Sequence, residues 1–150
     1  MKDTRYTIKK GFTKTPKVRP NLSFTYVNEE NFEANMRAFA DSIDLENKTR
    51  QAHSFTLLEA QERINDGCVA YLFKEGGKPL GHVWFYQNYM YDVFLGKTGR
   101  RNDDEALLKA VIEDYNHPAA TSIHVFTEGY NKFENTLYDK KLDGVVGNIN

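Results

Sequence analysis

The chain is poor in the features that mark secreted and membrane-spanning proteins. Cys68 is its single cysteine, so no internal disulfide can form, and an unpaired thiol is typical of a reducing compartment. No apolar run approaches the length of about twenty residues that a membrane-spanning helix needs. Residues 1–5 lead into no apolar block of signal-peptide type. We therefore expect a cytoplasmic protein without a membrane partner.

The sequence also lacks the patterns of metal enzymes and serine hydrolases. Its four histidines, His53, His82, His117 and His124, have no metal-ligand spacing, so no metal site is predicted. No serine lies in a nucleophile-elbow motif. These absences set aside the zinc-enzyme and serine-hydrolase classes.

Charge is nearly balanced overall but unevenly placed. The 150 residues carry a net charge of −1, with 40% hydrophobic and 27% charged residues, which are globular values. Residues 1–20 contain seven lysines and arginines and one aspartate, so their net charge is +6 and that of the remainder is −7. We expect residues 1–20 to form a basic N-terminal arm or edge strand and residues 21–150 to form a single domain.

Two interpretations of the basic arm remain open. Tyr6 and Ile8 alternate with polar residues, as in an edge strand whose lysines oppose aggregation. Alternatively, the arm contacts nucleic acid or another polyanion through its lysines and arginines.

Hydrophobic periodicity and turn signals predict the elements that follow Pro20. Thr56 and Glu59 have the spacing of a capping box, and the adjacent Gly76 and Gly77 supply the positive φ of a tight hairpin. The predicted order is strand 22–27, a helix capped at Asn28, helix 56–66, strands 68–74, 80–86 and 89–95, a helix from 102, strand 122–126, a helix from 131 and strand 145–149.

The segment after strand 122–126 begins with Asn131 and carries Leu137 and Tyr138, with Tyr138 seven residues after Asn131. It resembles the last helix of the GNAT superfamily of acyltransferases, and the order of elements after residue 21 is also similar to that fold. The resemblance implies an α+β protein of three layers. Its mixed, mostly antiparallel sheet would be flanked by helices and splayed between a fourth strand, 91–95, and a fifth strand, 122–126.

The resemblance further implies transfer of an acetyl group from acetyl-CoA, as co-substrate, to a small-molecule or peptide amine in a ternary complex. Tyr138 would protonate the leaving thiolate, and Asp92 on the fourth strand is the candidate base. A backbone N–H near Phe94 or Leu95 would stabilise the oxyanion. Asn131 would contact the pantetheine arm.

The sequence departs from the family at the pyrophosphate loop. The family pattern is Arg/Gln-x-x-Gly-x-Gly/Ala, whereas this chain has Gly99, Asn102 and Asp104 at the defined positions. Asn102 and Glu105 predict a capping box, and the acidic first turn of the helix would repel phosphate. The remaining candidates for contacts with the cofactor phosphates are Lys97, Gly99, Arg100, Arg101 and Asn102.

This departure leaves two interpretations. The chain is either an active N-acetyltransferase with a divergent phosphate loop or a catalytically inactive GNAT-like binding module that contacts nucleic acid through its basic arm. The nine Tyr, ten Phe and one Trp offer a way to distinguish partners. Aromatic rings exposed beside a positive face favour nucleic acid, whereas rings that close a cleft beside Asp92 and Tyr138 favour a small amine.

Overall fold

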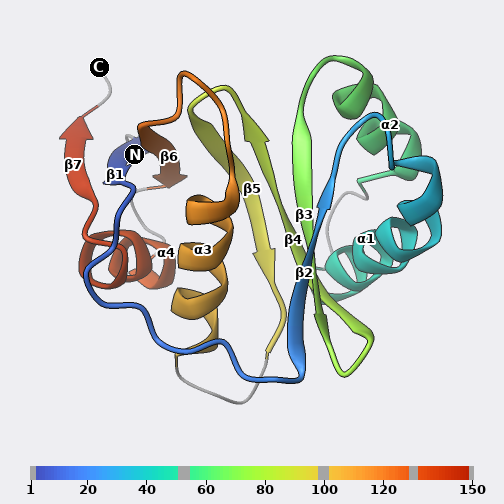
Figure 1. The fold of residues 1–150 in the computed structure, drawn as a ribbon, viewed down its shortest axis with the longest axis horizontal. Coiled ribbons are helices and arrows are strands. Elements are labelled where there is room, and N and C mark those ends of the chain that lie inside the picture. Colours follow the sequence, from blue (N-terminus) through green and yellow to red (C-terminus); the bar gives the residue numbers. More distant parts are fainter. Residues whose placement is uncertain (1–2, 51–54, 98–101, 129–131, 149–150) are drawn as a thin grey trace.

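A seven-stranded mixed sheet forms the middle of three layers in the computed structural model (Figure 1). The structure describes residues 3–50, 55–97, 102–128 and 132–148. The strand order is β2-β3-β4-β5-β6-β1-β7, and every neighbouring pair is antiparallel except β5 with β6. The strands are β1 Asp3–Lys9, β2 Leu22–Val27, β3 Val69–Glu75, β4 Lys78–Tyr86, β5 Tyr89–Leu95, β6 Ser122–Glu128 and β7 Val145–Asn148. The predicted α+β architecture is confirmed.

Helices cover both faces of the sheet. One face carries α1, Met36–Arg50, and α2, Leu57–Asn65, with a 3-10 turn, Glu33–Asn35, before α1. The other carries α3, Asp103–Asp114, and α4, Lys132–Thr136, which continues into a π-helical turn, Leu137–Lys141. Among the described residues, none of the helices combines the length and apolar character needed to cross a bilayer.

The strands supply one buried core to each helical layer because successive side chains point to opposite faces. On β3, Leu72 packs with the residues of α1 and α2, whereas Tyr71 and Phe73 pack with those of α3. On β4, Trp84 and Phe85 divide in the same way. Near-continuous burial of these two central strands follows from this two-sided coverage.

Two local predictions are confirmed. Gly76 and Gly77 have φ values of 58° and 80°, as the β3–β4 hairpin requires. The Thr56 hydroxyl accepts a hydrogen bond of 3.1 Å from the Glu59 N–H and caps α2.

The expectation of an edge strand near the N-terminus is wrong in position. β1 lies inside the sheet, antiparallel to β6 on one side and to β7 on the other, so β7 is the edge. Both partners of β1 are more than a hundred residues away in the sequence, which is why local alternation alone did not reveal its place.

The segment between β1 and β2, which we call the strap (residues 10–21), runs along α3 (Figure 1). Lys10 Nζ donates to the Tyr115 carbonyl beyond the C-terminal end of α3. Midway, Lys109 Nζ donates to the Lys14 carbonyl over 2.5 Å. These contacts fix part of the basic segment to the body of the protein, while the side chains of Lys14 and Lys17 are exposed.

Arg19 attaches the strap to the start of α3. Its Nη2 lies 2.6 Å from Asp103 Oδ2 and 2.9 Å from Glu75 Oε2, and its Nε donates to Asp103 Oδ1 over 3.1 Å. The fork of two N–H groups thus matches the carboxylate of Asp103, whose side chain is buried. The predicted Asn102 capping box is wrong, because the Asn102 side chain makes no capping hydrogen bond and tertiary pairing with Arg19 organises this helix start instead.

We expect Arg19→Met to lower the melting temperature because it leaves the buried Asp103 carboxylate without its arginine fork. Lys17→Met, an exposed position on the same strap, is the matched control and should change the melting temperature little. Adding Asp103→Asn to Arg19→Met should recover part of the loss in a double-mutant cycle. Equal effects of Arg19→Met and Lys17→Met on thermal denaturation would contradict the role given to this ion pair.

Candidate functional site

The two parallel strands β5 and β6 pair only at their beginning. The pairs are Tyr89 with His124 and Met90 with Val125, and no further pair joins the described residues of these two strands. Beyond Met90 the strands enclose a hollow of about 210 Å³, which we call the splay cleft. The predicted adjacency and divergence of these strands is confirmed.

The splay cleft brings together the two residues that the sequence analysis singled out for catalysis. Asp92 lines it from β5 and Tyr138 lines it from the π-helical turn. Arg50 from α1 and Phe126 from β6 contribute further walls. Four separate elements therefore converge on one hollow, although these residues are far apart in the sequence.

A bulge in β5 places Asp92 at this hollow. The register passes from His82 opposite Phe94 to Trp84 opposite Tyr91, so β5 has one more residue than β4 across this interval. Asp92 lies in the left-handed region with a φ of 48°. Aspartate tolerates this conformation better than most residues, and such bulges redirect side chains at the margins of functional sites.

Backbone alternation distinguishes the two amides proposed as oxyanion donors. The Gly96 N–H bonds to the Leu80 carbonyl over 2.7 Å, so Gly96 and Leu80 form a hydrogen-bonded pair. By alternation, the N–H of Phe94 also points toward β4, whereas the N–H of Leu95 points away from β4, to the side of the cleft. The Val93 carbonyl agrees with this pattern, because it accepts a hydrogen bond of 3.2 Å from Arg50 Nη2.

Tyr138 lies in a wide helical turn. The Leu142 N–H bonds to the Leu137 carbonyl five residues earlier, over 3.0 Å, and such π-helical turns are frequent at functional sites. The Tyr138 side chain is almost fully buried, and its ring centroid is 5.9 Å from that of Tyr6. Burial, reinforced by the negative charge of Glu134, raises the pKa of Tyr138 well above its ordinary value, so its phenol keeps its proton.

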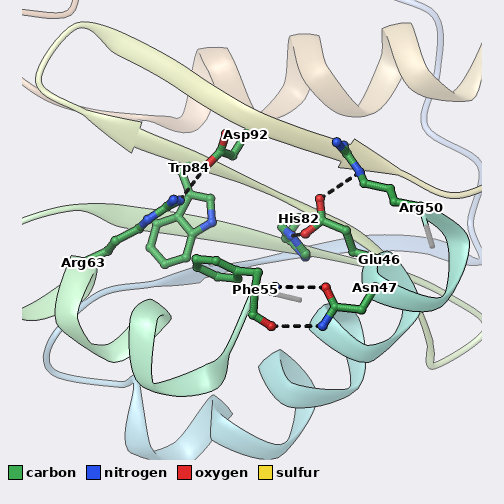
Figure 2. A pocket seen from close by; sticks show the side chains of 8 residues that line it. All are labelled: Glu46, Asn47, Arg50, Phe55, Arg63, His82, Trp84 and Asp92. Atoms are coloured by element: carbon green, nitrogen blue, oxygen red, sulfur yellow. Dashed lines mark hydrogen bonds and ion pairs between the residues drawn. The ribbon is translucent and has the colours of Figure 1, made fainter. Parts of the chain in front are cut away.

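A second hollow of about 240 Å³ lies on the α1 and α2 side of Asp92 (Figure 2). Arg63 extends across it and places its guanidinium 4.6 Å from the Phe55 ring, 5.1 Å from Trp84 and 5.2 Å from Tyr91. Its Nη1 is 2.8 Å from Asp92 Oδ2, an ion pair without hydrogen-bond alignment. Asp92 therefore has a cation partner that sequence patterns did not indicate.

A chain of polar side chains, of which Figure 2 draws His82, Glu46 and Arg50, lines this hollow. The Ser42 hydroxyl is 2.7 Å from His82 Nδ1, His82 Nε2 is 2.9 Å from Glu46 Oε1, and Glu46 Oε2 is 3.0 Å from Arg50 Nε. Burial would raise the pKa of Glu46, but the His82 hydrogen bond and charge, with Arg50 and Arg63, bring it below its ordinary value. Because both His82 nitrogens are engaged, this histidine positions Glu46 and is not placed to act as a base.

The sequence analysis missed Glu46, Arg50 and Arg63. A signal was present for two of them, because Ser42, Glu46 and Arg50 recur every four residues and so lie on one face of α1. No local sequence pattern marks Arg63. Its partners are Phe55 before α2, Trp84 on β4 and Asp92 on β5.

The predicted phosphate contacts are placed only in part. Lys97 is exposed, and Asn102 precedes α3, whereas Gly99, Arg100, Arg101 and Asn131 lie outside the described residues. Burial, followed by the charge of Asp103, raises the pKa of Asp104 in the first turn of α3. Among the described residues, no group of three or more His, Cys, Asp or Glu is arranged to hold a metal ion.

Comparison with solved structures shows that the fold is shared. A functionally unknown conserved protein from Staphylococcus epidermidis aligns with 97% of this chain and 57% of its own, at 8% identity and a TM-score of 0.63. A Drosophila protein aligns with 99% of this chain and 49% of its own, at 11% identity and a TM-score of 0.62. A GCN5-related N-acetyltransferase from Kribbella flavida aligns with 92% of this chain and 53% of its own, at 13% identity and a TM-score of 0.53.

The chain thus spans about half the length of these structures. No protein-family model matches the sequence, and no curated protein matches it either. At these identities the likeness shows the fold alone, and that fold is GNAT-like.

Proposed function

We propose that this chain transfers an acetyl group from acetyl-CoA to an amine. The observation that carries the proposal is the splay cleft, where β5 and β6 part and where Asp92 and Tyr138 both form the wall. A parted pair of strands offers backbone donors to an extended ligand, as sheet edges do in strand-addition complexes. The thioester arm of acetyl-CoA is such an extended ligand.

The proposed chemistry is direct attack of a neutral amine on the thioester carbonyl. The carbon–nitrogen bond forms as the carbon–sulfur bond breaks, the thiolate accepts a proton and the amine loses one. The Leu95 N–H, which by strand alternation points away from β4, is the proposed donor to the developing oxyanion. The Phe94 N–H points toward β4 and has no such role.

Tyr138 is the proposed proton donor to the thiolate. Its raised pKa keeps the phenol protonated throughout the range in which a thiolate forms, and its burial limits competition from water. Asp92 is the proposed acceptor of the amine proton. Since Arg63 Nη1 lies beside Asp92 Oδ2, the amine would approach the other carboxylate oxygen or displace Arg63.

Binding of the cofactor phosphates is the step that the start of α3 favours least. Lys97, Arg100 and Arg101 are the proposed cationic partners, in place of a glycine-rich backbone cradle. Arg19 pairs with Asp103, and Lys109 Nζ lies 3.0 Å from Glu105 Oε2, which leaves Asp104 as the acidic residue of this first turn that most directly opposes a phosphate. An inactive GNAT-like binding module is the alternative that this acidic start of α3 favours.

Thermal denaturation with acetyl-CoA tests the proposal. At a hundred times its dissociation constant, acetyl-CoA should stabilise the protein by about 2.7 kcal/mol. The control is adenosine 3′,5′-bisphosphate, which lacks the pantetheine arm. It should stabilise the protein less, because nothing then occupies the splay cleft. No stabilisation at millimolar acetyl-CoA, together with no thiol release from any amine, would favour the binding module.

Asp104→Asn should strengthen acetyl-CoA binding by about two- to fivefold, because it removes one negative charge from the helix start. The matched control is Asp44→Asn, an exposed aspartate on α1. Titration calorimetry measures both dissociation constants. Unchanged affinity in Asp104→Asn would show that the phosphates bind elsewhere.

Tyr138→Phe should lower turnover by about 10²–10⁴-fold, the usual contribution of general acid catalysis, because the ring remains and the proton donor is lost. Tyr6→Phe is the control, since it removes a buried hydroxyl from the neighbouring ring. The readout is the rate of thiol release, with melting temperatures of all three proteins. Equal turnover in wild type and Tyr138→Phe would eliminate the general-acid role.

A further inference from the structure

Next to the splay cleft lies a third, mainly apolar hollow of about 480 Å³, which we call the aromatic groove. Its rings are Tyr86 at the end of β4, Tyr89 and Tyr91 on β5, and Phe126 on β6. Met90, Cys68 and Asp66 complete it. The volume is within the range of sites that enclose small organic ligands.

The groove exposes aromatic surface that the fold leaves uncovered. Tyr86, Tyr89 and Phe126 are 41%, 38% and 43% exposed. The rings of Tyr89 and Phe126 stack with centroids 5.7 Å apart and planes 13° apart. A contiguous aromatic patch of this kind marks a binding surface more often than scattered exposed residues do. A flat ring is the group that best extends such a stack.

The aromatic groove shares two wall residues with the splay cleft. Tyr91 and Phe126 line both hollows, and Asp92 follows Tyr91 directly on β5. A ligand whose ring lies in the groove can therefore extend a short chain past Tyr91 toward the reacting thioester. The groove thus adjoins the site of the proposed acyl transfer.

Charge excludes a polyanion from this groove. Asp66 is the one carboxylate that lines it, and no lysine, arginine or histidine is among its described lining residues. Phosphate would find no cation among these lining residues, whereas an ammonium is compatible with both the carboxylate and the faces of the rings. The exposed aromatics therefore argue for an amine and against stacked nucleic-acid bases.

We infer that the acceptor is a primary amine that carries an aromatic ring on a short chain, with the ring held in the aromatic groove. This inference rests on the proposed acyl transfer and names its substrate class. Tyr89 and Tyr86 act as specificity residues because they contact the ring and not the reacting atoms.

A binding experiment tests the groove without requiring activity. With methionine methyl groups labelled, 2-phenylethylamine should shift the resonance of Met90, which lies in the groove, and leave that of Met36 on α1 unchanged. Propylamine at the same concentration should shift neither. Tyr89→Ala should weaken the phenylethylamine response about tenfold, in line with the loss of one ring contact in an apolar pocket.

Two further variants make the result specific. Tyr86→Ala is a second groove variant outside the β5–β6 pairing, and it should weaken the Met90 response in the same direction. Tyr26→Ala removes a tyrosine of equal exposure, 38%, on β2 and outside the groove. It should leave the response unchanged. Melting temperatures confirm that each variant is folded.

Turnover separates this inference from the proposed function. In wild type, kcat/KM for phenylethylamine should exceed that for propylamine by about tenfold or more, and Tyr89→Ala should abolish this preference. Equal values for the two amines would overturn the inference and leave acyl transfer standing. A Tyr89-dependent Met90 shift without thiol release would support the aromatic-amine site and contradict acyl transfer. No Met90 shift, with dimerisation that Tyr89→Ala abolishes, would make the groove a self-association surface and overturn the inference.

Discussion

The early end of the pairing between β5 and β6 is the constraint on which the site depends. Two residue pairs, Tyr89 with His124 and Met90 with Val125, join the two halves of the sheet, and the strands then separate. In a continuous sheet the N–H groups of β5 that point away from β4 would bond to β6. Separation instead leaves a hollow that four elements can reach, and all the proposed chemistry takes place there.

The rest of the fold holds this separation in place. β1 pairs along the whole of β6 and, with β7, supports the half of the sheet beyond the cleft. The β4–β5 pair supports the other half, and Gly81 allows close contact there, since a Cβ at this position would lie 2.1 Å from the Phe94 carbonyl oxygen. On the α1 side, Arg50 bonds to the Val93 carbonyl and so occupies a backbone acceptor that a paired strand would otherwise satisfy.

Sequence reasoning found those parts of the molecule that depend on local patterns. The β3–β4 hairpin followed from Gly76 and Gly77, and the cap of α2 followed from Thr56 and Glu59, because each requires only neighbouring residues. The adjacency of β5 and β6 followed from the order of elements. The placement of Asp92 and Tyr138 at one cleft followed from the family resemblance and not from their spacing in the sequence.

The parts that sequence reasoning missed depend on contacts between distant segments. The capping box at Asn102 has a correct local pattern, but Arg19, more than eighty residues earlier, pairs with Asp103 and sets the helix start. The inner position of β1 depends on a strand at the other end of the chain. The place of Arg63 in the site depends on its contacts with Phe55, Trp84 and Asp92, which the fold brings together. Tertiary context overrides local preference in all three cases.

The central claim is that the splay cleft receives the thioester arm of acetyl-CoA. Backbone amide NMR during an acetyl-CoA titration tests it most directly. The account predicts saturable shifts at the amide of Leu95 and at residues 125–127 of β6, with the β2–β3 amides on the far side of the sheet unaffected. A titration that saturates while the amides of Leu95 and β6 stay unchanged would contradict it.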